Sequence, residues 1–147
     1  MKTVNSMKLS FISKSVNESF ARAAVASFLL PLDPTVAQIA DVKTAVSEAV
    51  TNAIVHAYPD AFGTVYIEAR LTDTGRAIIK IRDRGIGIPD IAKAMEPLYT
   101  TSTDERAGLG FAVMQSFTDK VKVRSTVGKG TTVTLEKLIS RSEDGQK

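Results

Sequence analysis

The first third of the chain contains a stretch with apolar residues at helical spacing. Its apolar positions are Phe20, Ala24 and Phe28. Ser15 lies three residues before Glu18, which is the spacing of a capping box, and Pro31 prevents a helix from continuing. We therefore predict an amphipathic helix between residues 15 and 30.

A second and longer helix is predicted directly after the first. Asp33 suits an N-cap and Pro34 the first helical position, because proline has a fixed φ and lacks an N–H that would be unpaired there. The apolar stripe that follows consists of Ile39, Val42, Val46, Val50, Ala53 and Ile54. The helix should end near Tyr58, before Pro59.

Alternation of apolar and polar residues predicts strands in the remaining segments. Two pairs of strands are each joined by a glycine-containing turn, which predicts two hairpins: residues 65–71 with 76–83, and residues 121–127 with 131–138. A shorter alternating stretch, residues 7–13, predicts an edge strand. Residues 109–117 predict a further helix, after a polar, glycine-rich stretch that is long for a loop.

This order of elements predicts a two-layer α/β sandwich. The helices should pack on one face of a mixed, mostly antiparallel sheet. A chain of 147 residues that is 44% hydrophobic supports one core of ordinary size. We therefore expect a single domain over residues 1–139 and a polar tail over residues 140–147.

Composition excludes several classes of function. The chain has no cysteine, so disulfides, thiol nucleophiles and thiolate metal sites are ruled out. It has no apolar run of about 18 residues and no signal-peptide core, which predicts a cytoplasmic protein with no membrane partner. The net charge of +3 comes from 19 basic and 16 acidic side chains mixed along the sequence. Mixed charge predicts no direct nucleic-acid partner, and the basic outward positions after Lys120 suggest a solvated sheet face.

The second predicted helix carries three polar residues on one side. In SEAVTNAIVHAY, Glu48, Asn52 and His56 are spaced by four. A carboxylate can polarise a hydroxyl or a water, and an amide oxygen can bind Mg²⁺, which prefers oxygen ligands. Taken alone, however, this spacing is more typical of a solvated helix face.

Two glycine-containing segments offer further candidate chemistry. Asp83 ends a predicted strand beside Gly85 and Gly87, so a carboxylate lies next to backbone that a purine can approach closely. A simple turn capped by Asp83 explains this segment equally well. Gly108 and Gly110 open a predicted helix, whose free N–H groups can face a polyphosphate, although a tight connection is an alternative. Together with the helix pair, the two segments match the base, metal and phosphates of one nucleotide.

The motifs resemble those of the GHKL ATPase superfamily, in which an N-box, a G1 box and a G2 box surround ATP in the Bergerat fold. Nearly the whole chain, including NESFARAAVASF, VSEAVTNAIVHAY and GLGFAVMQSF, is similar to the anti-sigma F factors of endospore-forming bacteria. The resemblance implies a kinase that uses ATP and Mg²⁺. It also implies two partners, since such a kinase phosphorylates a serine of an anti-anti-sigma factor and, as a homodimer, inhibits the sporulation sigma factor F.

The resemblance also implies roles for individual residues. Glu48 would be the catalytic base and Asn52 the Mg²⁺ ligand. Asp83 would read the adenine, with Gly87 beneath the base and Thr132 supporting it. Residues 97–107 would form a lid over the nucleotide. The residues implied to bind phosphates are Arg106, Gly108, Leu109 and Gly110, and those implied to contact protein partners are Arg22 and Arg106.

Three alternatives remain at this stage. The chain also resembles kinases that restrain the general-stress sigma factor, or it acts as a nucleotide-gated module that binds a sigma factor with little catalysis. A detached ATPase domain of a sensor histidine kinase is less consistent with the sequence, because no helix with a phosphoacceptor precedes the domain. His56 is interpreted as a polar residue at a helix end, and Arg22 equally suits an ordinary exposed position.

Overall fold

A five-stranded sheet forms one layer of the structure, a computed structural model that describes residues 1–95 and 105–139. The strands are β1 (Thr3–Ile12), β2 (Thr64–Thr72), β3 (Arg76–Arg82), β4 (Lys120–Thr126) and β5 (Gly130–Leu138). Their order in the sheet is β1-β2-β3-β5-β4, so β1 lies at an edge, as predicted. All four strand pairings among the described residues are antiparallel. In this part of the chain the sheet is therefore antiparallel and not mixed.

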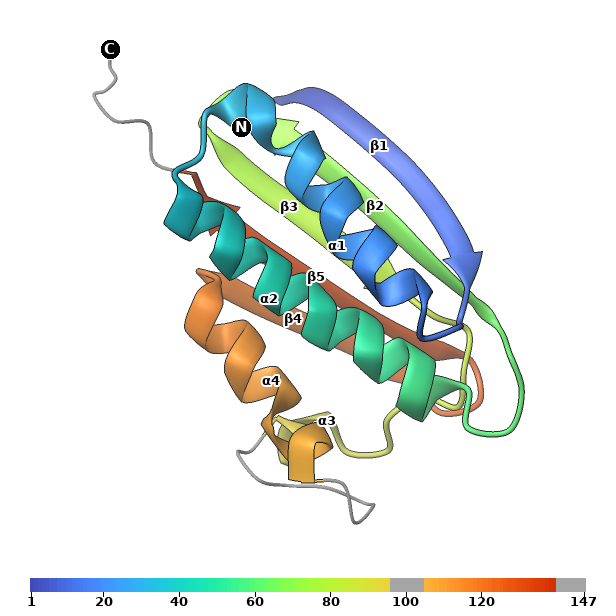
Figure 1. The fold of residues 1–147 in the computed structure, drawn as a ribbon. Helices are drawn as coiled ribbons and strands as arrows, with labels where there is room; N and C mark the ends of the chain where they lie inside the picture. Colours follow the sequence, from blue (N-terminus) through green and yellow to red (C-terminus); the bar gives the residue numbers. More distant parts are fainter. Residues whose placement is uncertain (96–104, 140–147) are drawn as a thin grey trace.

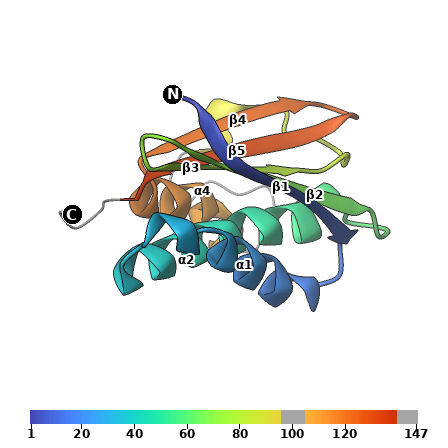
Figure 2. The same ribbon diagram turned by 90° about the horizontal axis from the view of Figure 1, so that it is seen from above.

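Helices cover one face of this sheet and leave the other open (Figures 1 and 2). The three longer helices are α1 (Asn17–Phe28), α2 (Val36–Asn52) and α4 (Glu105–Phe117). The shorter elements are a 3-10 turn (Leu30–Leu32), a π-helical turn that extends α2 (Ala53–Ala57) and α3 (Ile91–Ala94). The predicted two-layer α/β sandwich is therefore confirmed. Within the described residues, no helix is long and apolar enough to cross a membrane.

The core lies between the two layers. On β2, Val65, Ile67, Ala69 and Leu71 are at most 1% exposed, whereas the residues that alternate with them, Tyr66, Glu68 and Arg70, face away from the helices. This alternation follows from the two-residue repeat of a strand. The core therefore fixes which side chains of each strand point towards the helices and which point towards the open face.

The start of α1 differs from the prediction. Its N-cap is Val16, without a side-chain hydrogen bond, so Ser15 and Glu18 do not form a capping box. The Glu18 carboxylate instead accepts a hydrogen bond from Arg22 at 2.8 Å. The buried stripe is also shifted by one residue from the predicted one, since it consists of Ala21, Val25 and Leu29. Phe20 is 52% exposed, because the small Ala21 takes the position that faces the core.

The start of α2 differs as well. The N-cap is Thr35, whose hydroxyl accepts a hydrogen bond from the backbone N–H of Gln38, while the Gln38 side chain accepts one from the backbone N–H of Thr35. Asp33 lies outside the helix in a left-handed conformation with φ of 54°. The predicted Asp33-Pro34 start was therefore wrong by two residues, because a reciprocal capping box satisfies more backbone groups than a single N-cap.

Candidate functional site

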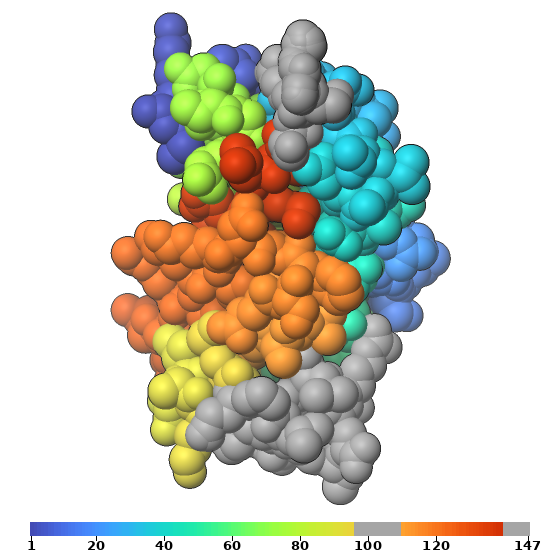
Figure 3. Space-filling view, turned by 90° about the vertical axis from the view of Figure 1, so that its left-hand side faces the viewer, coloured from blue at the N-terminus to red at the C-terminus, as the bar shows by residue number. Residues whose placement is uncertain are grey.

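The first part of the candidate site is the side of α2 that faces α4. Glu48 and Asn52 lie one helical turn apart and are half-buried. The helix is held in place by Val46, Ala49 and Val50, which are buried in the core. Figure 3 shows α4 adjoining α2 and β4 on one flank of the molecule. The polar pair therefore lies at a helix–helix contact, which separates it from an ordinary solvated helix face.

Gly110 brings α4 directly against this pair. A Cβ atom added to Gly110 would lie 3.4 Å from both side-chain heteroatoms of Asn52 and 3.5 Å from Oε1 of Glu48. The predicted meeting of the N-box and the G2 box is thus present at Gly110. A glycine here leaves a small space beside one carboxylate and one amide. Their oxygen atoms are the kind of ligand that Mg²⁺ prefers.

The glycine segment itself lies elsewhere in its helix than predicted. The sequence predicted that Gly108, Leu109 and Gly110 open a helix, but α4 begins earlier, at Glu105. The unpaired N–H groups of its first turn therefore include those of residues 105–107, before Gly108. The side chains of residues 105–109, and so that of Arg106, lie outside the described residues. Of the predicted lid, residues 97–107, the part from 97 to 104 also lies outside them, and residues 105–107 belong to α4.

Asp83 forms the second part of the site, directly after β3. It is only 7% exposed, and its Oδ1 accepts hydrogen bonds from the backbone N–H groups of Gly85 at 2.9 Å and Thr131 at 3.1 Å. Burial raises the pKa of the Asp83 carboxyl above its ordinary value, and the two N–H groups partly oppose this shift. Among the described residues, none donates a hydrogen bond to Oδ2, so this oxygen can accept one from a ligand amino group.

The loop after Asp83 joins the two parts of the site. The backbone N–H of Ile86 donates to the carbonyl of Ala57, at the end of the π-helical turn that extends α2, at 3.0 Å. A Cβ atom on Gly85 would overlap this carbonyl. His56 lies in this turn, near the end of the extended helix. The glycine after Asp83 is therefore required for contact with α2.

Gly87 and Gly130 connect the same loop to the β4–β5 turn. Gly87 has φ of 80°, and a Cβ atom there would lie 2.5 Å from the Thr126 carbonyl oxygen. Gly130 has φ of 124° and lies against the Asp83 carbonyl so closely that a Cβ atom would overlap it. Both glycines are thus explained by backbone packing. The role of Gly87 beneath a nucleotide base remains a prediction.

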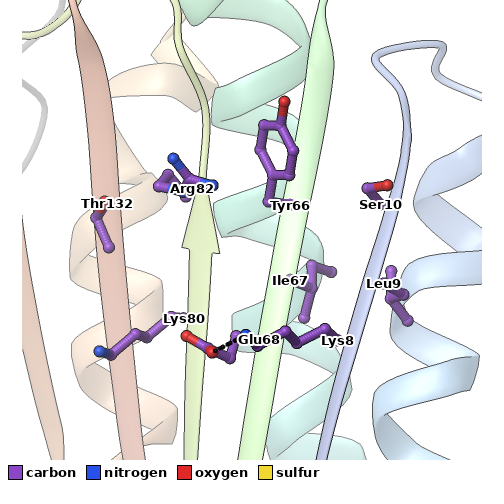
Figure 4. Close-up of a pocket in the computed structure, with 9 residues that line it drawn as sticks. All are labelled: Lys8, Leu9, Ser10, Tyr66, Ile67, Glu68, Lys80, Arg82 and Thr132. Carbon is purple, nitrogen blue, oxygen red and sulfur yellow. Dashed lines mark ion pairs between the residues drawn. The ribbon is translucent and has the colours of Figure 1, made fainter.

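Thr132 lies on the other face of the sheet from Asp83. In β5, Val133 and Leu135 point into the core, so Thr131 points to the same side and Thr132 to the open face. Figure 4 shows Thr132 beside Lys80 and Arg82 on that open face. The residue that contacts Asp83 is Thr131, whose hydroxyl also lies 2.8 Å from Ser125 Oγ. The assignment of Thr132 was therefore shifted by one residue, which on a strand reverses the face.

Arg22 lies away from the nucleotide site. It pairs with Glu18 at 2.8 Å on α1 and donates to Ser47 Oγ of α2 at 3.4 Å, and its side chain is 38% exposed. The exposed part of this side chain is accessible to another protein. Partner contact by Arg22 remains a prediction.

Comparison with known proteins identifies the family. The sequence profile of the histidine kinase-like ATPase domain matches residues 14–137. The anti-sigma F factor of Caldanaerobacter subterraneus subsp. tengcongensis is 55% identical over 94% of this chain and 96% of its own length. That of Clostridium acetobutylicum is 55% identical over 95% of this chain and 98% of its own, and that of Priestia megaterium 50% over 95% and 96%.

Solved structures support the fold. A Mycobacterium tuberculosis protein with RsbU and RsbW domains superposes with a TM-score of 0.69 at 21% identity, covering 94% of this chain and 33% of that protein. The blue-light activated histidine kinase of Erythrobacter litoralis superposes with a TM-score of 0.60 at 20% identity, covering 82% of this chain and 41% of that protein. With the sequence matches, these findings show that the chain belongs to the anti-sigma F factor family and carries a histidine kinase-like ATPase domain.

Proposed function

We propose that the chain binds ATP with Mg²⁺ between α2, α4 and the loop after β3. The observation that carries this proposal is the close approach of Gly110 to Glu48 and Asn52, which leaves space beside two oxygen donors. Asp83 would accept a hydrogen bond from the adenine amino group, and Asn52 would hold the Mg²⁺. The ion would neutralise charge on the phosphates. The first turn of α4 would supply free N–H groups to those phosphates, with Arg106 as an added cation.

We further propose that the reaction is transfer of the terminal phosphate to a serine of an anti-anti-sigma factor. The serine Oγ would form the new bond to phosphorus while the bond to the bridging oxygen of ADP breaks. Glu48 would accept the serine proton. Catalysis of this kind depends mainly on positioning and charge neutralisation, so a rigid α2 that holds both Glu48 and Asn52 suits it.

The same chain would restrain the sporulation sigma factor F. Family membership supports an anti-sigma role, and the relatives named anti-sigma F factor support sigma F as the partner. We propose that the chain acts as a homodimer in the cytoplasm and that Arg22 contacts a partner. Exchange between the sigma factor and the anti-anti-sigma factor would then be governed by the bound nucleotide.

The test of the kinase proposal is a phosphotransfer assay with Mg-ATP and an anti-anti-sigma protein, with mass mapping of the product. Glu48→Gln should lower transfer by about 10²- to 10⁴-fold, the range for loss of a general base, and leave nucleotide binding intact. Glu68→Gln, on the open face of the sheet, is the matched control and should retain full transfer. Normal transfer by Glu48→Gln would reject the role of this residue.

A nucleotide-gated binding module with little catalysis is the competing function. It predicts that the chain forms an ATP-dependent complex with the sigma factor but yields no phosphoserine on the anti-anti-sigma protein. Pull-down with purified sporulation and general-stress sigma factors, in the presence of ATP, would distinguish the partner as well. Preferential capture of the general-stress factor would contradict the proposed assignment to sigma F.

A further inference from the structure

The open face of the sheet is strongly basic. Three cross-strand rows of side chains face away from the helices, and each row has one residue from every strand. The three rows consist of Ser10, Tyr66, Arg82, Thr132 and Arg124; Lys8, Glu68, Lys80, Thr134 and Lys122; and Ser6, Arg70, Ile78, Glu136 and Lys120. Seven of these fifteen side chains are basic and two are acidic, a net charge of +5. We call this set the basic sheet face.

The basic sheet face carries more positive charge than the whole protein. The chain has a net charge of +3, so the residues outside the face together carry −2. Basic and acidic residues are mixed along the sequence, but the two-residue repeat of the strands sorts them onto different surfaces. The sequence predicted no concentrated positive surface, because charges of both signs are mixed along the chain. The folded structure nevertheless has one.

Few of these cations are neutralised by neighbouring carboxylates. Glu68 pairs with Lys8 at 3.5 Å, and Glu136 pairs with Arg76, at the margin of the face, at 3.3 Å. In the part of the chain that the structure describes, Lys80, Lys122 and Arg124 form no ion pair with a carboxylate. An unneutralised group of cations on one surface attracts a polyanion.

Further cations surround one end of the face. The guanidinium carbon of Arg82 lies 4.4 Å from the centre of the Tyr66 ring, and that of Arg84 lies 5.1 Å from it. A groove of about 290 Å³ there is lined by Arg82, Arg84, Arg124 and Lys129, among others. Figure 4 shows the adjoining groove, with Lys80, Arg82 and Tyr66 projecting from the sheet. Both guanidinium groups lie over the Tyr66 ring, so the ring is not free to stack on a base of a bound nucleic acid. A ligand would therefore contact this face through charges.

The composition of the face favours nucleic acid over a protein partner. Stable protein interfaces depend on a buried apolar or aromatic centre. Among the fifteen positions, the large aliphatic residue is Ile78, and it is only 5% exposed. A second copy of the chain is also disfavoured, because face-to-face packing would bring together two surfaces of +5. Contact with phosphates needs cations and no apolar centre.

The dimensions also suit a phosphate backbone. Side chains on one face recur about every 6.7 Å along a strand, and five strands span about 19 Å across. Duplex DNA carries about one negative charge per 1.7 Å of its axis, so cations at this spacing can contact several phosphates without a fixed register. We propose that the basic sheet face binds duplex nucleic acid through its phosphates, independently of sequence.

The experiment measures the fluorescence anisotropy of labelled 20-base-pair DNA duplexes of two unrelated sequences between 50 and 200 mM salt. We expect binding of similar affinity to both sequences, weakening linearly in log affinity against log salt concentration. The slope should correspond to several phosphate contacts, at about 0.9 per contact. Failure of the protein to bind either duplex at about 100 μM and 50 mM salt would overturn the proposal.

Charge-neutralising variants locate the site. The triple variant Lys80→Gln, Lys122→Gln and Arg124→Gln should reduce the slope by about 2 to 3 and weaken binding at least tenfold at 50 mM salt. The control Lys14→Gln, Lys43→Gln and Lys93→Gln removes the same charge elsewhere and should retain the slope within about 0.5. Melting temperatures establish that both variants are folded. An equal loss in the two variants would overturn the assignment to this face.

Two further measurements test whether an acidic protein or a second copy of the chain binds the basic sheet face instead. Poly-glutamate of matched charge should bind more weakly than the duplex, and equal or tighter binding would indicate an acidic protein partner instead. Sedimentation should show the same oligomeric state for the wild type and the sheet-face variant. A change of that state would mean that the face lies between copies of the chain, which contradicts the proposal.

Discussion

Gly110 of α4 lies so close to Asn52 of α2 that an added Cβ would be 3.4 Å from both heteroatoms of the Asn52 side chain. At this point α4 contributes no side chain to the helix–helix contact, so its backbone lies directly against the Asn52 side chain. This relationship connects the helix pair to the glycine segment, and it makes Gly110 a sensitive position at which to separate folding from nucleotide binding.

Gly110→Ala should leave the fold intact and impair nucleotide binding. The methyl group would fill the space beside Asn52 and Glu48 at ordinary van der Waals distances, and alanine favours the helix by up to about 1 kcal/mol over glycine. We expect unchanged or slightly higher stability in urea denaturation and at least tenfold weaker binding of Mg-ATP by calorimetry. A variant that unfolds, or that binds Mg-ATP normally, would contradict this account of the site.

Gly128 and Gly130 form a matched pair in the β4–β5 turn. Both have positive φ, but a Cβ on Gly128 would meet nothing within 4 Å, whereas one on Gly130 would overlap the Asp83 carbonyl. Gly128→Ala should therefore cost about 1–2 kcal/mol of unfolding free energy, which is the penalty of left-handed backbone. Gly130→Ala should cost more than about 3 kcal/mol. If both variants lost the same unfolding free energy in denaturant titrations, the close contact of Gly130 with Asp83 would make no contribution to stability.

The buried carboxyl of Asp83 should make the unfolding free energy of the protein depend on pH. Because burial raises its pKa in the folded protein above the ordinary value of 3.8, the protonated form is favoured by folding. The contribution of this carboxyl to stability is fully present below 3.8 and is lost as the pH rises through the folded-state pKa. Relative to Asp83→Asn, the wild type should therefore become less stable as the pH increases across this window, measured by urea denaturation. The opposite slope would show that the N–H groups of Gly85 and Thr131 outweigh burial.

Neighbouring threonines on β5 should respond differently to substitution. Thr131→Val removes a hydroxyl that lies 2.8 Å from Ser125 Oγ beside Asp83, so it should weaken ATP binding and cost about 0.5–1.5 kcal/mol of stability. Thr132→Val changes a side chain on the open face and should leave ATP affinity within about twofold. If Thr132→Val alone weakened ATP binding, the nucleotide would have to reach the other side of the strand.

The sequence by itself determined the fold class and the family. The apolar repeats of 3.6 and 2 residues, together with the Asp83 and Gly110 segments, predicted the layers and the boxes, because these depend on local spacing. Periodicity could not fix the cap of α1, the start of α4 or the choice between Thr131 and Thr132. These depend on which residue the core buries, and an error of one residue reverses the face of a strand.

Tertiary structure alone decided how distant segments meet. The contacts of Gly110 with Asn52, of Gly85 with Ala57 and of Gly130 with Asp83 join segments that are far apart in the chain, so no local pattern contains them. The same applies to charge. The sequence mixes basic and acidic residues, and the pairing of five strands gathers seven basic side chains on one face, because hydrogen-bonded register, not chain order, determines which side chains are neighbours.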